Sequence, residues 1–204
     1  MLKIGVTGGI GSGKSTVCNI FRNLGVPIFT SDDEGKRLMN TDAELRKQIK
    51  AAFGNDTYTS SNEIDRERMA NLVFNDNQAL MELSNLVHPK VRKAFEDWCI
   101  QYEKRPYVIK EAAILFESGH YHDMDKIINI FAPKEERILR VMERDHITKD
   151  EVLKRMRFQY TDEERNRLAD FIIINEEEQD LLPQVMELHE IFLNEKQNGK
   201  TIFK

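Results

Sequence analysis

A glycine-rich run close to the first residue of the chain has the residue types and spacing that bind a polyphosphate. It fits the pattern G-x-x-x-x-G-K-[ST] at every fixed position, and its residues are Gly8, Gly9, Ile10, Gly11, Ser12, Gly13, Lys14, Ser15 and Thr16. Glycines let the backbone turn its N–H groups toward the phosphates, where a Cβ would obstruct the approach. Lys14 is suited to the β- and γ-phosphates, and the Ser15 hydroxyl is suited to Mg²⁺. We therefore expect Gly9 to Thr16 to bind a nucleotide, with Ser15 as the metal ligand.

The elements on both sides of this run support the prediction, because the motif works only between a strand and a helix. Residues 2–7 form a short, mostly apolar strand candidate. After the run, apolar residues recur at helical spacing until Gly25, namely Val17, Ile20, Phe21 and Leu24. We expect this helix to begin at Lys14, with its positive end toward the phosphates. A glycine-rich turn that binds nothing is the disfavoured alternative.

An acidic side chain, Asp32, follows the second strand candidate, residues 28–30. In a parallel doubly wound sheet, ligands gather at the carboxyl ends of the strands, so we expect Asp32 to face the same crevice as Lys14. From there its carboxylate could accept the proton of an attacking hydroxyl group. Asp32 is equally well placed to cap the following helix, and both interpretations stay open.

The most basic stretch of the chain lies at about residues 134–167. Two capping-box patterns, Thr148-x-x-Glu151 and Thr161-x-x-Glu164, predict three helices with breaks between them. On the first helix, basic side chains recur close to one face, at Arg137, Arg140 and Arg144. Beside a phosphate loop, such a hairpin is predicted to be a lid that neutralises charge during phosphoryl transfer. The alternative is a solvated, salt-bridged surface.

Composition narrows the class of protein. The chain has 204 residues, 32% charged residues and a formal net charge of −5, which argues against nucleic acid or an anionic membrane as a partner. Cys18 and Cys99 have no metal-type spacing and are interpreted as core thiols. With neither a signal segment nor a membrane span in the sequence, we expect a cytoplasmic protein, and no obligate protein partner is evident.

The strand candidates predict an α/β fold, a doubly wound five-stranded parallel sheet of the P-loop kinase type. Besides the two already described, short apolar runs occur at residues 107–110, 127–131 and 171–174. Residues 42–104 carry helical patterns only, so we expect a helical insertion for the acceptor substrate there. The nucleotide-binding core then comprises residues 1–41 and 105–204, with a helical lid at about 134–167.

Two missing sequence patterns distinguish among the classes of nucleotide-dependent protein. The Asn/Thr-Lys-x-Asp sequence that specifies guanine is lacking, and no strand ends in the apolar run plus Asp that motors and ATPases use. These features favour an ATP-dependent small-molecule kinase. A nucleoside or nucleotide monophosphate kinase and a nucleotide-gated switch protein remain as alternatives.

Taken together, the short motifs resemble the dephospho-coenzyme A kinase family over nearly the whole chain. The matches are Gly8 to Thr16, Thr30-Ser31-Asp32, Leu86-Val87-His88-Pro89, Ile114-Leu115-Phe116-Glu117, Arg144-Asp145, Arg155-x-x-x-Gln159, Ala169-Asp170 and Asn175. The resemblance implies transfer of the ATP γ-phosphoryl group to the ribose 3′-hydroxyl of dephospho-coenzyme A, the last step of coenzyme A synthesis. It also implies that the inserted helices hold the acceptor and that the basic hairpin closes over ATP.

Site residues follow from this resemblance position by position. It implies Lys14, Asp32 and Arg144 as catalytic residues, Arg140, Arg144 and Asn175 as further nucleotide contacts, and Asp32, His88, Leu115, Phe116 and Glu117 as acceptor contacts. His88-Pro89 also suits an ordinary helix start, and Phe116 and Glu117 also suit packing and capping.

Several positions depart from the family pattern. Thr30 replaces the first of two aspartates, so Asp32 alone inherits the role of base, and Ala113 stands where proline is common. Glu111 occupies a position that is often aspartate and is a second candidate acid. Glu176 follows Asn175 where a small residue is frequent, which puts contacts of that loop with adenine in question.

Overall fold

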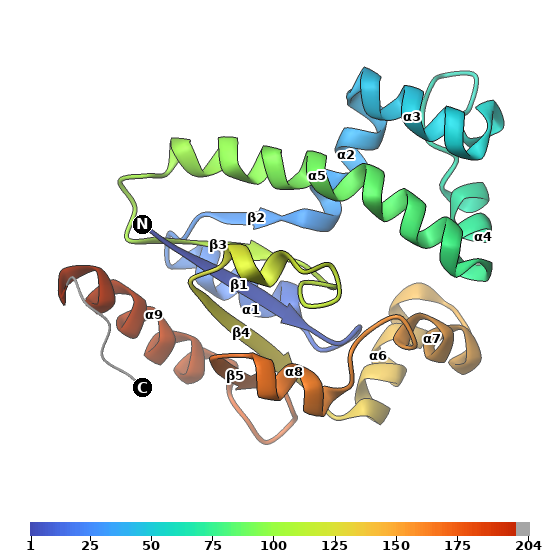
Figure 1. Cartoon of the computed structure of the whole chain (residues 1–204). Coiled ribbons are helices and arrows are strands. Elements are labelled where there is room, and N and C mark those ends of the chain that lie inside the picture. Colours follow the sequence, from blue (N-terminus) through green and yellow to red (C-terminus); the bar gives the residue numbers. More distant parts are fainter. Residues whose placement is uncertain (199–204) are drawn as a thin grey trace. The chain divides into compact units, whose positions relative to one another are not determined.

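One parallel sheet forms the centre of the larger of two compact units (Figure 1). The computed structural model describes residues 1–198. The strands have the order β2-β3-β1-β4-β5, and their bounds are β1 Leu2–Gly8, β2 Ile28–Thr30, β3 Tyr107–Glu111, β4 Lys126–Phe131 and β5 Phe171–Ile174. All four neighbouring pairs are parallel, which confirms the predicted doubly wound sheet. Because the strand order reverses at β1, the loop that follows β1 lies where ligands bind in this architecture.

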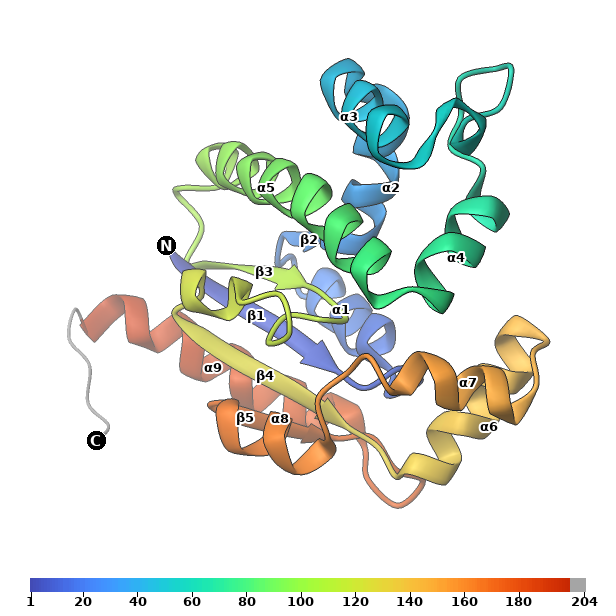
Figure 2. The same ribbon diagram turned by 45° about the vertical axis from the view of Figure 1, so that its right-hand side comes forward.

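Helices cover both faces of the sheet (Figure 2). α1 (Lys14–Asn23) and α9 (Leu181–Asn198) pack on the face that carries the alternate apolar residues of β1, β3 and β4. Phe21 and Phe192 are fully buried in that layer. α8 (Asp162–Leu168) lies against β4 on the opposite face, where the buried Asn129 donates to Asn166 Oδ1 over 2.6 Å. The alternation of β-strand side chains thus places the apolar layer under α1 and a polar layer under α8.

The second unit, Ser31–Trp98, is helical. It contains α2 (Ser31–Thr41), α3 (Ala43–Phe53), a 3₁₀ turn at Asn55–Thr57, α4 (Arg66–Asn75) and most of α5 (Asn77–Gln101). Its core includes Leu45, Ile49, Met69 and Val73. The sequence placed the insertion at 42–104, whereas the compact unit runs from 31 to 98 and so includes α2.

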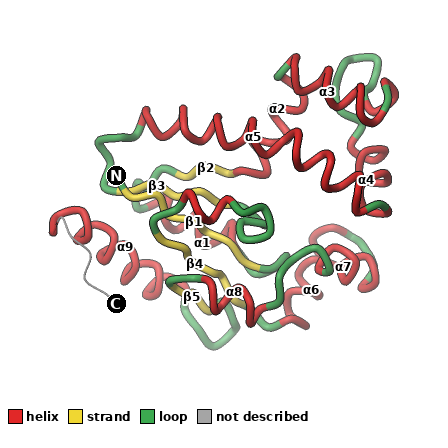
Figure 3. The backbone as a smooth tube through the Cα atoms, viewed as in Figure 1, coloured by secondary structure: helices red, strands yellow, loops and turns green. Residues whose placement is uncertain are grey.

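The basic stretch folds as a helical hairpin followed by α8 (Figure 3). α6 (Lys134–Asp145) and α7 (Lys149–Met156) pack through Ile138, Val141 and Val152. Both predicted capping boxes are present, one at the start of α7 and one at the start of α8. In each box the Thr hydroxyl accepts from one backbone N–H group and the Glu carboxylate accepts from another.

Both cysteines are buried and neither forms a disulfide, as expected of core thiols. Burial raises the pKa of the Cys18 thiol to about 12, so this thiol stays protonated and unreactive at neutral pH. Within residues 1–198, no helix is long and apolar enough to cross a membrane.

Candidate nucleotide and phosphoryl-transfer site

The phosphate loop has a backbone that requires glycine. Gly11 and Gly13 have φ values of 79° and 90°, in the left-handed region that L side chains rarely adopt. A Cβ on Gly13 would also lie 2.1 Å from Asn175 Nδ2. Directly after Gly13, α1 begins at Lys14, as predicted from the sequence. The loop therefore leads directly into the first turn of α1 through a conformation that glycine permits.

Backbone N–H groups give this end of the loop hydrogen-bond donors and partial positive charge. Ser15 and Thr16 lie in the first turn of α1, whose N–H groups have no acceptor within the helix. The helix dipole adds partial positive charge at the same end. Ser12 N–H instead closes the loop by donating to Gly9 O over 3.0 Å. This arrangement matches what an anionic polyphosphate needs.

Two polar side chains of the motif, Lys14 and Ser15, lie at the end of the loop. Lys14 Nζ donates to Gly8 O at 2.9 Å and to Gly9 O at 3.4 Å, so the ammonium lies over the loop. Ser15 is exposed, which leaves its hydroxyl accessible to a cation. Across residues 1–198, no three His, Cys, Asp or Glu side chains are grouped as metal ligands. The Ser15 hydroxyl is a side-chain group of this loop that could serve as a ligand to phosphate-bound Mg²⁺.

Asn175 and Arg140 are brought to the phosphate loop. Asn175 follows β5 and donates from Nδ2 to Ser12 O over 2.8 Å. Arg140 on α6 donates from both terminal nitrogens to the Asn175 carbonyl at 3.3 Å and pairs with Glu136 at 2.7 Å. Residues far apart in the sequence thus meet at the end of the sheet where the loop lies.

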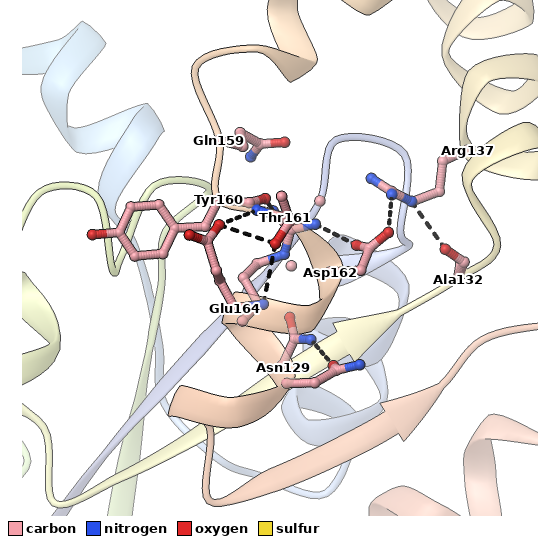
Figure 4. Close-up of polar contacts among 12 residues, drawn as sticks. Asn129, Ala132, Arg137, Gln159, Tyr160, Thr161, Asp162 and Glu164 are labelled. Atoms are coloured by element: carbon pink, nitrogen blue, oxygen red, sulfur yellow. Dashed lines mark hydrogen bonds and ion pairs between the residues drawn. The ribbon is translucent and has the colours of Figure 1, made fainter.

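Arg137 corrects the prediction of a single basic face on α6. Its side chain is buried, with Nε donating to Ala132 O at 2.9 Å and NH2 pairing with Asp162 at 2.7 Å (Figure 4). The buried Arg165 guanidinium binds the other oxygen of the same carboxylate. Burial lowers the pKa of the Arg137 guanidinium. Since an arginine stays charged, two cations share one anion beside the phosphate loop.

The same arginine also explains a glycine of the motif. A Cβ on Gly9 would lie 2.0 Å from Arg137 NH1, so the guanidinium packs directly on the loop backbone. Arg137 is thus a fixed charge behind the loop and not a mobile lid cation.

Arg144 remains at the surface of the hairpin. Its guanidinium donates two hydrogen bonds, of 2.7 and 3.0 Å, to the Asp145 carboxylate. Arg155 donates to the same carboxylate at 2.7 Å. The Arg144 guanidinium, followed by Arg155, lowers the pKa of Asp145. With 62% of its side chain exposed, Arg144 can leave this pair at little energetic cost.

The loop after β3 contains the predicted acceptor residues Leu115, Phe116 and Glu117. Leu115 is 0% and Phe116 2% exposed, and both pack in a cluster with Ile127. Glu117 Oε1 accepts a hydrogen bond of 2.7 Å from Tyr160 N–H. These contacts are those of the packing and capping alternative.

Asp32 and His88 belong to the helical unit. α2 begins at Ser31, so Asp32 lies in its first turn and is exposed. His88 lies inside α5, which continues through Pro89, so the interpretation of His88-Pro89 as a helix start is wrong. Glu111, the second candidate acid, is the last residue of β3.

The strand–loop–helix phosphate site on a parallel sheet of this order defines a nucleotide-binding kinase of the P-loop class. The sequence profile of the dephospho-CoA kinase family matches residues 2–180. The chain is 36% identical over 187 residues to a dephospho-CoA kinase of Bacteroides fragilis (strain YCH46), covering 92% of this chain and 91% of that one. It is 40% identical over 182 residues to a dephospho-CoA kinase of Chlorobaculum tepidum, covering 86% of each chain.

A solved structure agrees with these sequence matches. Dephospho-CoA kinase from Campylobacter jejuni superposes with a TM-score of 0.70 at 28% identity, covering 95% of this chain and 98% of that one. The chain belongs to the dephospho-CoA kinase family. The family resemblance and the kinase class predicted from the sequence are thereby confirmed.

Proposed function

We propose that this chain transfers the γ-phosphoryl group of ATP to the ribose 3′-hydroxyl of dephospho-coenzyme A. The observation that carries the proposal is the phosphate loop at the carboxyl end of β1, with left-handed Gly11 and Gly13 and with Lys14 Nζ over the loop. Family membership supplies the acceptor. In the reaction, the 3′-oxygen bonds to the γ-phosphorus, the bond from that phosphorus to the bridging oxygen breaks, and ADP leaves with the electron pair.

The loop and its neighbours would bind ATP. The N–H groups of the first turn of α1 hold the phosphates, and Lys14 follows the charge of the transferring group. Ser15 contributes a hydroxyl ligand to Mg²⁺, which when bound neutralises phosphate charge. Asn175 contacts Ser12 O, which supports its assignment to nucleotide binding.

The acceptor side uses the helical unit. Asp32 takes the proton of the attacking 3′-hydroxyl, because its carboxylate is exposed in the first turn of α2 and can act as a general base. His88 on α5 is assigned to acceptor contact. Leu115 and Phe116 are buried and Glu117 accepts from Tyr160 N–H, so these three residues shape the loop after β3 that is assigned to acceptor contact.

The decisive experiment compares acceptors. With ATP·Mg²⁺, dephospho-coenzyme A should be phosphorylated with a kcat/KM far above that of adenosine or AMP, because binding energy of the remote pantetheine arm orients the 3′-hydroxyl. Acceptors with a shortened pantetheine arm should show a lower kcat as well as a higher KM. ADP release is measured for each acceptor and without any acceptor. Equal kcat/KM values for the three compounds would favour a generic nucleotide kinase, and hydrolysis indifferent to every acceptor would favour a nucleotide-gated switch.

Arg144 provides a test of the lid. Arg144→Ala should lower kcat/KM for ATP by about tenfold or more, because the cation that leaves Asp145 for the phosphates is lost. Arg144→Lys should restore only part of this, since an ammonium gives no planar two-point contact to phosphate oxygens. Steady-state kinetics with varied ATP measure both variants. Lys149→Ala is the matched control, because it removes an equally exposed cation of the hairpin that pairs with Glu135. Wild-type kinetics in Arg144→Ala would make this arginine a solvated surface residue.

A further inference from the structure

The side-chain amide of Gln159 joins the phosphate loop to the loop after β3. Gln159 lies between the end of α7 and the start of α8. Its Oε1 accepts a hydrogen bond of 2.8 Å from Ile10 N–H, and its Nε2 donates a hydrogen bond of 2.8 Å to Ala113 O. An uncharged amide offers an acceptor and a donor on one planar group, which both contacts require.

Neighbouring contacts hold Gln159 in place. Tyr160 donates its N–H to Glu117 Oε1 at 2.7 Å, and its ring stacks on Phe116 with centroids 6.5 Å apart and planes at 8°. Arg165 binds the Tyr160 carbonyl and shares Asp162 with Arg137. The segment that carries Gln159 is therefore anchored at Tyr160, the residue directly after it.

The hydrogen bond to Gln159 gives Ile10 N–H a structural role in the phosphate loop. Its N–H is committed to the side-chain amide and so fixes the curve of the phosphate loop. On the other side of the loop, Asn175 holds Ser12 O over 2.8 Å. The side-chain amides of Gln159 and Asn175 thus both hold the phosphate loop, and its remaining N–H groups are oriented before phosphates bind.

We propose that Gln159 is a positioning residue for nucleotide binding, one that keeps the phosphate loop in its binding-competent conformation. The proposal rests on the proposed function only in taking ATP as the nucleotide. A loop that is competent for only part of the time binds with an affinity reduced by that fraction. Loss of Gln159 should therefore weaken nucleotide binding while leaving the reaction of the saturated enzyme nearly intact.

The test compares two variants that each remove an amide bonded to two backbone groups. Gln159→Met should raise the Kd of the Mg²⁺ complex of a non-hydrolysable ATP analogue about tenfold or more, which corresponds to about 1.4 kcal/mol. Its kcat at saturating ATP should stay within about threefold of wild type. The control is Asn40→Leu in the helical unit, because Asn40 accepts from Ile64 N–H at 2.8 Å and donates to Lys36 O at 3.0 Å. We expect Asn40→Leu to lower the melting temperature and to leave the Kd unchanged.

Amide hydrogen exchange provides a second measurement that does not depend on activity. In the wild-type protein without nucleotide, the Ile10 amide should be protected, and Gln159→Met should abolish that protection while Asn40→Leu should not. If Gln159→Met fails to fold, the exchange rate of the Ile10 amide in the wild-type protein without nucleotide still tests the proposal. A wild-type Kd in Gln159→Met, or an unprotected Ile10 amide in the wild-type protein, would overturn the proposal.

The outcomes also separate this inference from the proposed acceptor. Nucleotide binding is measured without dephospho-coenzyme A, so a weakened Kd in Gln159→Met stands even if that acceptor is not phosphorylated. Conversely, normal turnover of dephospho-coenzyme A by Gln159→Met with an unchanged Kd removes Gln159 and leaves the proposed function intact.

Discussion

Lys14→Ala is expected to lower kcat by about a hundredfold or more while the protein folds normally. Lys14 Nζ lies at 2.9 Å from Gly8 O and can follow the transferring phosphoryl group, whereas the amides of the loop stay fixed to the backbone. The expected size is that of removing one preorganised donor to transition-state charge. Because α1 begins at Lys14 and alanine is a good helix former, little stability should be lost. Single-turnover kinetics at saturating ATP measure the effect on the chemical step.

A charge-matched control separates this effect from a general loss of positive charge. Arg22→Ala removes a cation from the last turn of the same helix, where it contacts Asn19, and should leave kcat unchanged. Direct titration with nucleotide should show that Lys14→Ala still binds ATP through the loop amides. Turnover of Lys14→Ala close to that of wild type would remove Lys14 from the mechanism.

The sequence predicts those elements whose signals are local. The capping boxes at Thr148 and Thr161 start α7 and α8, because the hydroxyl and carboxylate that satisfy the first N–H groups lie three residues apart. β5 occupies residues 171–174 as predicted, since a short β-branched run favours a strand, and Ile173 of this edge strand is fully buried. The phosphate loop was predictable for the same reason, because its glycines and lysine are contiguous.

Long-range partners explain what the sequence does not predict. Arg137 follows the same helical spacing as Arg140 and Arg144, and only the fold places Asp162 and Ala132 O around it. The bond of Gln159 to Ile10 spans 149 residues, so no local pattern indicates it. The one signal present was the spacing of Arg155 and Gln159, which indicates a family position but not a physical role.

The helix start expected at His88-Pro89 is wrong for a related reason. A proline favours the first turn of a helix, so His88-Pro89 resembles a helix start. α5 nevertheless runs from Asn77 to Gln101, and packing along its length outweighs the loss of one backbone hydrogen bond at Pro89. Val91 and Phe95, two and six residues after Pro89, are 4% and 2% exposed, which is the burial that holds the helix together across the proline.

Asp32→Asn is expected to lower kcat by about 10²- to 10⁴-fold, the range associated with loss of a general base. Asparagine keeps the size of the side chain and removes its basicity, so the 3′-hydroxyl would have to lose its proton without help. Asp32 lies in the first turn of α2, where loss of its favourable interaction with the helix dipole is expected to cost about 1 kcal/mol of stability. The pH dependence of kcat and the melting temperature are measured together.

The neighbouring Asp33 is the control that makes this experiment decisive. It lies in the same first turn and pairs with Lys36 at 3.0 Å, so Asp33→Asn removes the same charge from the same helix end. We expect Asp33→Asn to match Asp32→Asn in melting temperature and to keep wild-type kcat. If Asp32→Asn retains activity while its melting temperature falls, Asp32 stabilises α2 and does not accept the proton. The base would then be sought at Glu111, the carboxylate that ends β3 one strand away from the phosphate loop.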